Sequence, residues 1–167
     1  MVTKEPIIDF AEFSQDNVVA DKAAVLESNP HRFELALLDG ILLIDEKRAV
    51  GFKDVEEDAF WVRGHFPEKA VMPGVLICEC AAQLTAYFAN QHDIRSEGVM
   101  ALGGMNNCRF RSPVLPGDRL TILLKMKKAR KGVMVTTEFQ AYVDKRLCAE
   151  GEIKGIMMPV ELSLIHI

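Results

Sequence analysis

The alternation of apolar and polar residues divides this chain into short extended segments on either side of one long apolar segment. Residues 75–90 are apolar on nearly every side of a helix, a pattern typical of a helix that is buried all round. Two strand-like segments precede it and five follow it, separated by glycine and proline turn signals. The predicted strands span residues 33–45, 48–57, 99–105, 108–114, 120–128, 133–144 and 147–158. This order predicts an α+β domain in which an antiparallel sheet wraps around one long central helix.

The whole chain, residues 1–167, is predicted to form a single domain. A chain of this length can bury a sufficient hydrophobic core without disulfides or a structural metal ion. Residues 1–17 are set apart as an N-terminal extension, and a short amphipathic helix within residues 18–26 ends before Pro30. The four cysteines lack the CxxC spacing of zinc and redox sites, which indicates free thiols in a reducing compartment. No metal ion and no cofactor is predicted.

The net charge of the chain and the length of its apolar runs exclude two classes of binding partner. The net charge of -4 argues against a nucleic-acid binder, which needs clustered Lys and Arg over a large face. Residues 1–9 do not resemble a signal peptide, and no apolar run reaches the roughly 18 residues that a membrane-spanning helix requires. We therefore expect a cytoplasmic protein that binds neither nucleic acid nor membrane.

Among the polar residues that interrupt the apolar helix, Glu79 and Gln83 are the important ones. Glu79 and Gln83 are four positions apart, so they lie on one face of the helix, one turn from each other. A carboxylate in such a setting is costly unless it is paired, hydrogen-bonded or neutralised. A helix-edge glutamate or a structural ion pair is one interpretation. The other is a carboxyl group held by the Gln83 amide, whose pKa is raised by burial so that it donates a proton near neutral pH.

The segment before this helix carries a candidate base. A lone histidine is often a packed or surface side chain, but His65 follows Gly64, which permits close backbone approach, and precedes Pro67, which stiffens the chain. The same segment leads to Gly74 at the predicted helix start, where free N–H groups favour negative charge. Base, acid and anion-binding N–H groups are what is needed to remove a C–H proton beside a carbonyl and expel a hydroxyl group.

At this point the sequence resembles a known family. GHFPEKAVMPGVLICECAAQ, residues 64–83, is similar to the signature of the FabZ-type 3-hydroxyacyl-(acyl-carrier-protein) dehydratases, and more distantly to the FabA type. Residues 30–33 (PHRF) and 109–118 (RFRSPVLPGD) resemble two further family motifs. The resemblance spans about residues 18–156 and implies the hotdog fold. Residues 99–106 lack the tyrosine or phenylalanine that often gates the acyl tunnel in the family.

The resemblance also implies roles for single residues. His65 would remove the proton from C2, Glu79 would protonate the departing C3 hydroxyl, and the Gly74 N–H would bind the thioester oxygen. The Val71 carbonyl would orient the His65 ring, and Gln83 would steady Glu79. Family members work as dimers in which His65 would face Glu79 of the partner chain, and the dimers can assemble into a hexamer as a trimer of dimers.

The implied partner is an acyl carrier protein that carries the substrate as a thioester. Arg109 and Arg111 are candidate contacts for its acidic surface, as is Lys128 within a basic run at residues 125–131. The alternative for that run is the solvated end of a strand.

Two other functions remain open on the same fold. A hotdog acyl thioesterase would use a carboxylate to activate water, and would release a free thiol. A non-catalytic acyl-binding protein would need neither member of the His65 and Glu79 pair, because a fold does not certify an activity.

Overall fold

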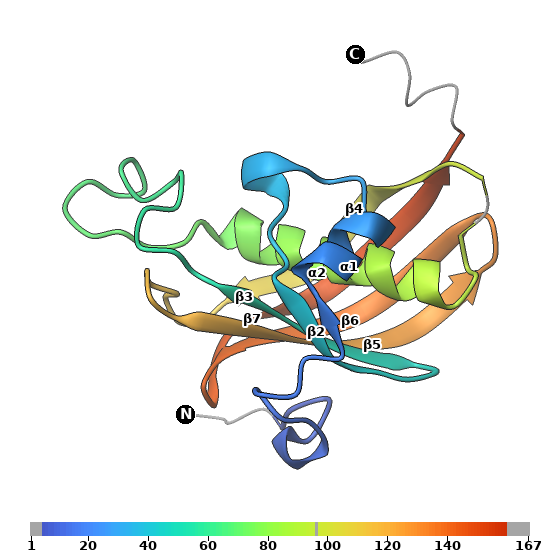
Figure 1. Ribbon diagram of the computed structural model, residues 1–167, viewed down its shortest axis with the longest axis horizontal. Helices are drawn as coiled ribbons and strands as arrows, with labels where there is room; N and C mark the ends of the chain where they lie inside the picture. Colours follow the sequence, from blue (N-terminus) through green and yellow to red (C-terminus); the bar gives the residue numbers. More distant parts are fainter. Residues whose placement is uncertain (1–4, 96, 160–167) are drawn as a thin grey trace.

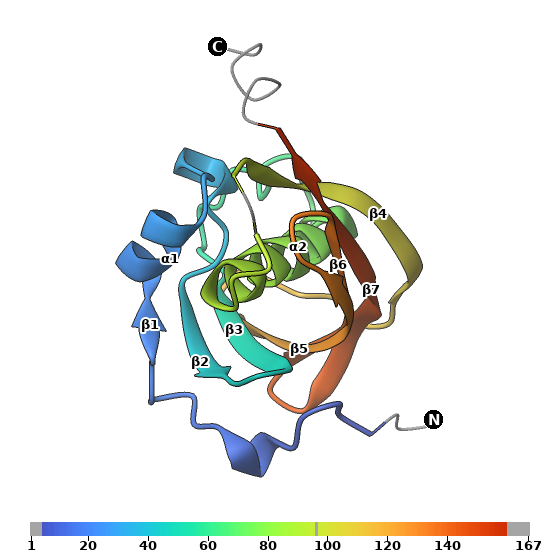
Figure 2. The ribbon, with the colours of Figure 1, turned by 90° about the vertical axis from the view of Figure 1, so that its right-hand side faces the viewer.

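The computed structural model describes residues 5–95 and 97–159. Its centre is the long helix α2 (Gly74–Gln91), and an antiparallel sheet of seven strands curls around this helix (Figures 1 and 2). The strand order is β1-β2-β3-β5-β6-β7-β4, which leaves β1 and β4 at the two edges. The predicted α+β hotdog architecture is therefore confirmed.

The remaining elements are three short helices near the N-terminus and the seven strands of the sheet. The helices are η1 (Phe10–Glu12), α1 (Lys22–Ser28) and η2 (Phe33–Leu35). The strands are β1 (Ala20–Asp21), β2 (Gly40–Ile44), β3 (Arg48–Asp54), β4 (Val99–Phe110), β5 (Arg119–Arg130), β6 (Met134–Val143) and β7 (Arg146–Met158).

Helix α2 is buried because apolar residues surround its axis. Ala81, Leu84 and Phe88 have no exposed surface, and they pack against the inward-facing side chains of the curled sheet. Those sheet residues include Ile122, Leu124, Phe139, Ala149 and Ile153. Burial of such side chains is the main favourable contribution to folding. The packing fixes the orientation of the helix, and with it the face that carries Glu79.

Three of the predicted strands differ from the structure. The first was expected over residues 33–45, but only Gly40–Ile44 forms a strand, because η2 turns the chain and the backbone of Leu35 and Leu37 hydrogen-bonds to Gln83 instead of to a neighbouring strand. The strands expected at 99–105 and 108–114 are one strand, β4, with two irregularities in its pairing with β7.

The N-terminal extension packs on the outer face of the sheet. Ile8 is 1% exposed and contributes to a second, smaller apolar cluster with Phe52 and Tyr142. The Ile7 N–H donates to the buried Gln140 side chain, which in turn donates to the Glu5 carbonyl. Helix α2 thus covers the inner face of the sheet, and the N-terminal extension covers part of its outer face.

Several smaller expectations concern charge, thiols and membrane segments. The basic run at residues 125–131 begins at the exposed end of β5, so the interpretation as a solvated strand end is confirmed for the strand part. All four cysteines are free. Within the described residues, no helix is both long and apolar enough to cross a membrane.

Candidate active site

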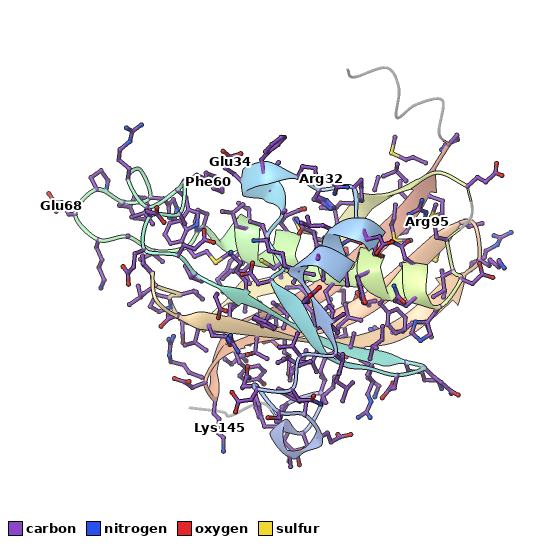
Figure 3. The ribbon with its side chains drawn as sticks, in the orientation of Figure 1. Arg32, Glu34, Phe60, Glu68, Arg95 and Lys145 are labelled. Atoms are coloured by element: carbon purple, nitrogen blue, oxygen red, sulfur yellow. The ribbon has the colours of Figure 1, made fainter. Side chains whose placement is uncertain are left out.

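The loop that carries His65 projects beyond the sheet, with Glu68 at its tip (Figure 3). His65 and Val71 are joined twice across this loop. The Val71 N–H donates to the His65 carbonyl at 2.8 Å, and His65 Nδ1 lies 2.7 Å from the Val71 carbonyl oxygen. Because a carbonyl only accepts, Nδ1 carries a proton, and in the neutral ring Nε2 keeps a free lone pair. The ring is therefore oriented as a base that acts through Nε2.

Helix α2 begins immediately after this loop, at Gly74. Pro73 occupies the N-cap position, and its carbonyl accepts from the Leu76 N–H at 2.9 Å. In the described part of the chain no side chain caps the first turn, so the N–H groups of Gly74 and Val75 are available to a ligand. A Cβ at position 74 would lie 2.7 Å from the ring of Phe110, which packs across the helix start from β4. Only glycine leaves the helix start and this ring undisturbed.

Glu79 and Gln83 meet on one face of α2, as their spacing predicts. Gln83 Nε2 donates to Glu79 Oε1 at 2.8 Å and to the Leu35 carbonyl at 2.7 Å, while Gln83 Oε1 accepts from the Leu37 N–H at 3.1 Å. Gln83 is 1% exposed, so these partners satisfy a side chain that would otherwise be buried at a cost. The amide thus holds the carboxyl group of Glu79 at a fixed orientation.

The electrostatics of Glu79 correct one expectation. Burial raises the pKa of Glu79, but hydrogen bonds from His31 and Gln83, together with the charge of His31, hold this pKa below the ordinary value of a glutamate. The prediction of a raised pKa is therefore wrong for the single chain. The apolar helix pattern predicted the burial correctly, but it contained no sign of the histidine that the chain folds against this carboxyl group.

His31 is the residue at this site that the sequence did not single out. Its Nε2 atom lies 3.4 Å from Glu79 Oε1, although 48 residues separate the two in the chain. The only signal was its place in the PHRF motif, which was interpreted as the entry to a strand.

A small cavity of about 50 Å³ continues from Glu79 along α2. Ala82 and Ala86 line it from the helix face that carries Glu79, since positions 79, 82 and 86 follow helical spacing. Leu102 of β4 and Gly155 of β7 line the opposite side. Most residues that line this cavity, called the slot below, are apolar, and it has room for the first carbons of a hydrocarbon chain beyond a group at Glu79.

The structure separates the predicted site residues into groups. Glu79 and Gln83 are in contact, and so are His65 and Val71, but in the described chain His65 and Glu79 form no hydrogen bond or ion pair with each other. Gly74 stands at the helix start between the two groups.

The basic candidates are also spread out. Arg109 is exposed near the end of β4, and Arg111 follows it but pairs with Glu150. Lys128 pairs through Thr136 with position 154 of β7, whereas Arg109 pairs with position 150. Four positions along a strand are about 13 Å, and the three strand spacings from β5 to β4 add about 14 Å across the sheet. Arg109 and Lys128 therefore do not form one cluster.

Comparison with known proteins identifies the family of this chain. The family model for the FabA-like domain matches residues 29–152. The FabZ 3-hydroxyacyl-[acyl-carrier-protein] dehydratases of Bacillus cereus (strain AH187) and Bacillus thuringiensis (strain Al Hakam) are each 40% identical over 134 residues, which cover 77% of this chain and 90% of each relative. The fold is that of a hotdog protein with a FabA-like domain. The chain belongs to the FabZ-type 3-hydroxyacyl-[acyl-carrier-protein] dehydratase family.

Solved structures give the same fold at low sequence identity. The dehydratase heterocomplex ApeI:P from Xenorhabdus doucetiae superposes with a TM-score of 0.71 at 15% identity, over 86% of this chain and 97% of that chain. Cj0977, a virulence protein from Campylobacter jejuni, superposes with a TM-score of 0.63 at 17% identity, over 87% of this chain and 95% of that chain. These two matches carry the fold and no more.

Proposed function

We propose that this protein dehydrates 3-hydroxyacyl thioesters to trans-2-enoyl thioesters, with His65 as base and Glu79 as acid. The observation that carries the proposal is the orientation of the base: the Val71 carbonyl engages Nδ1 and leaves Nε2 free. Membership of the FabZ-type family supports the same reaction. The carrier of the acyl group is an acyl carrier protein, and the enzyme works in the cytoplasm, in fatty acid or related acyl-chain synthesis.

The reaction follows from the positions of these groups. His65 Nε2 takes the proton from C2, and the electron pair of that C–H bond moves toward the thioester carbonyl, whose oxygen accepts from the Gly74 N–H. The pair then forms the C2–C3 double bond as the C3–O bond breaks. Glu79 gives its proton to the departing hydroxyl group, which leaves as water. Proton transfer by one positioned side chain contributes roughly 10²- to 10⁴-fold in rate.

The protonation state that Glu79 needs depends on the direction of the reaction. Dehydration needs neutral His65 and protonated Glu79, whereas hydration of the enoyl product needs protonated His65 and ionised Glu79. The lowered pKa of Glu79 in the single chain favours the ionised carboxylate that hydration needs over the protonated carboxyl group that dehydration needs. Covering Glu79 with a second subunit would raise its pKa again by removing water.

The active form is a homodimer, with a hexamer as a further assembly. In the described chain β4 pairs only with β7, so its outer edge has unpaired backbone groups along twelve residues. This edge also exposes Leu102 (46%), Met105 (43%) and Phe110 (54%). An uncovered, apolar edge strand of this length is a pairing surface. Pairing of β4 with its copy would bring His65 of the partner subunit toward Glu79.

The acyl chain lies in the slot along α2, from Glu79 past Ala82 to Ala86. The carrier protein docks near the helix start, where Arg109 and Arg111 flank Phe110 on the strand end that contacts Gly74. Because Arg111 already pairs with Glu150, Arg109 is the stronger candidate of the two. Lys128 is too far from that position to contribute to the same contact.

Hydration of a trans-2-enoyl thioester, followed as loss of enoyl absorbance, tests the reaction. Wild-type protein should hydrate it, and His65→Ala and Glu79→Gln should each lower kcat at least 10²-fold. His92→Ala and Glu68→Gln remove the same side chains from positions outside the site and should leave kcat unchanged. Retained activity in both site variants would refute these roles. Release of free thiol in place of hydration would assign a thioesterase, and binding without turnover would assign an acyl-binding protein.

Light scattering after gel filtration tests the assembly. Met105→Asp places a charge on the β4 edge and should yield a monomer without activity. Val133→Asp changes a side chain that is also 43% exposed, in the β5–β6 turn, and should remain a dimer. A wild-type monomer with full activity would contradict the shared site.

A further inference from the structure

The segment between α1 and β2 is fastened to α2 on both sides of His31. Asn29 Nδ2 donates to the Gln83 backbone carbonyl at 2.9 Å, and the Gln83 side chain binds the backbone of Leu35 and Leu37. His31 therefore sits in a short stretch with a fixed path. It faces Glu79 with Nε2 at 3.4 Å from Oε1, and both side chains line the small cavity along α2.

The hydrogen bonds of Gln83 determine which carboxyl oxygen of Glu79 accepts a hydrogen bond. Gln83 Oε1 must face the Leu37 N–H, which only donates, so the NH₂ group supplies the contacts to the Leu35 carbonyl and to Glu79. Glu79 Oε1 is consequently an acceptor. A proton on the carboxyl group has to reside on the other oxygen, Oε2.

The surroundings of His31 determine its tautomer. Its Nδ1 atom is buried and has no hydrogen-bond partner among the described residues. A proton on Nδ1 would be an unpaired buried donor, and it would leave the lone pair of Nε2 facing the lone pairs of Glu79 Oε1. In the neutral ring the proton therefore resides on Nε2, and in either protonation state the Nε2–H group faces Glu79 Oε1 at 3.4 Å.

We propose that His31 is a positioning residue for Glu79: with Gln83 it holds Oε1 as an acceptor, so that Oε2 carries the proton that Glu79 transfers. This inference rests on the function proposed above. In dehydration the Oε2–H bond breaks and its electron pair stays on the carboxylate, while the hydroxyl group of C3 takes the proton and leaves as water. Two N–H groups on Oε1 stabilise the charge that develops, which makes the transfer easier at the moment it occurs.

His31 is the only ionisable side chain in the described chain that acts on this carboxyl group. The lowered pKa of Glu79 arises from His31 and Gln83 against the opposing effect of burial. The strands that line the same cavity present no charged side chain toward it; their residues are Met100, Ala101, Leu102, Ile153 and Gly155. Loss of His31 should therefore act on one group, and the effect should appear in the pH profile.

Two substitutions separate positioning from packing. His31→Leu removes the N–H donor and fills its place with an apolar side chain. For enoyl hydration it should lower kcat about 10- to 100-fold, with KM within twofold of wild type. In the hydration assay, which needs ionised Glu79, it should also move the acid limb of the pH–rate profile to higher pH. The reason is that one of the causes that lower the pKa of Glu79 is gone. His31→Gln restores an N–H donor near the position of Nε2 and should recover most of kcat and the original acid limb.

His92→Leu is the matched control. His92 lies at the other end of α2, where its Nδ1 is 2.9 Å from the Phe88 carbonyl, and its removal should change neither kcat nor the acid limb. The proposal is overturned if folded His31→Leu keeps wild-type kcat and pH profile, or if His31→Gln is as impaired as His31→Leu. Either result, obtained with active wild type and inactive Glu79→Gln, leaves the dehydratase assignment standing.

Nuclear magnetic resonance tests the inference without turnover. In ¹⁵N-labelled wild-type protein the His31 ring, in its neutral form, should show a protonated Nε2 and a bare Nδ1. The ¹³C shift of the Glu79 carboxyl carbon should titrate at higher pH in His31→Leu than in wild type. A protonated Nδ1 with bare Nε2, or identical Glu79 titrations, would refute the contact even if the protein hydrated no enoyl thioester.

Discussion

Gln83 Nε2 lies 2.8 Å from Glu79 Oε1, and the remaining hydrogen-bonding positions of the Gln83 side chain engage the backbone of Leu35 and Leu37. One buried amide therefore joins the acid on α2 to the segment that leads into β2. Stability and activity are coupled at this residue, because the same side chain satisfies the backbone and orients the carboxyl group.

Gln83→Leu should consequently lower both. The change leaves the Leu35 carbonyl and the Leu37 N–H without their partner, and at about 1–3 kcal/mol for each unsatisfied buried group the free energy of unfolding should fall by about 2–6 kcal/mol. Urea denaturation measures this loss, and the enoyl hydration assay should show a lower kcat. Gln91→Leu, at the exposed end of α2, should be neutral in both; an equal loss there would mean that any leucine in this helix is harmful.

Ala86→Leu should shorten the preferred acyl chain. Ala86 is 6% exposed and lines the slot seven residues beyond Glu79, so a larger side chain there blocks the far part of the slot without touching the acid. Relative kcat/KM over enoyl substrates of increasing length should fall for the long chains and stay unchanged for the shortest. A uniform fall over all lengths would place the acyl chain elsewhere.

The pKa of Glu79 predicts a pH dependence of stability. Because this pKa is lower in the folded chain than in the unfolded chain, the ionised carboxylate stabilises the fold at pH values above the ordinary glutamate pKa of about 4.3, and this contribution is lost as pH falls through the lowered value. The free energy of unfolding of wild type minus that of Glu79→Gln should therefore shrink as pH falls from about 6 to about 3. A difference that grows with acidity would contradict the direction of the shift.

The thiols should differ in reactivity. Burial, with a further contribution from Cys108, raises the pKa of Cys78 to about 12, and burial also raises the pKa values of Cys80 and Cys148. These three thiols stay protonated at pH 8 and should resist iodoacetamide until the protein unfolds. Mass spectrometry of alkylated peptides with and without urea measures this protection. Rapid labelling of Cys80 in the native protein would show that α2 is not buried as described.

The N-terminal extension should be part of the folded unit. Ile8→Ala removes a side chain that is 1% exposed on the outer face of the sheet and should lower the free energy of unfolding by about 2–4 kcal/mol, with KM unchanged. Val18→Ala, at a position that is 44% exposed, should cost much less. If Ile8→Ala were as mild as Val18→Ala, the extension would contribute little to the core.

The elements with a strong pattern were predicted well. The apolar run of α2 and the turn signals around β5, β6 and β7 specify their structure locally, so these boundaries agree with the prediction within two residues. The expected strand over residues 33–45 failed because the buried amide of Gln83, distant in sequence, takes the backbone groups that a strand would have used.

The sequence by itself determined which reactive groups the site contains. They are an imidazole in a loop stiffened by proline, and a carboxyl group with an amide one helical turn away. Local spacing is enough for this, because helical periodicity sets which neighbours share a face. Only the tertiary structure decided which nitrogen of His65 is free and which oxygen of Glu79 is occupied. Both depend on contacts across the fold, and the lowered pKa of Glu79 depends on His31, which no local pattern brings to α2.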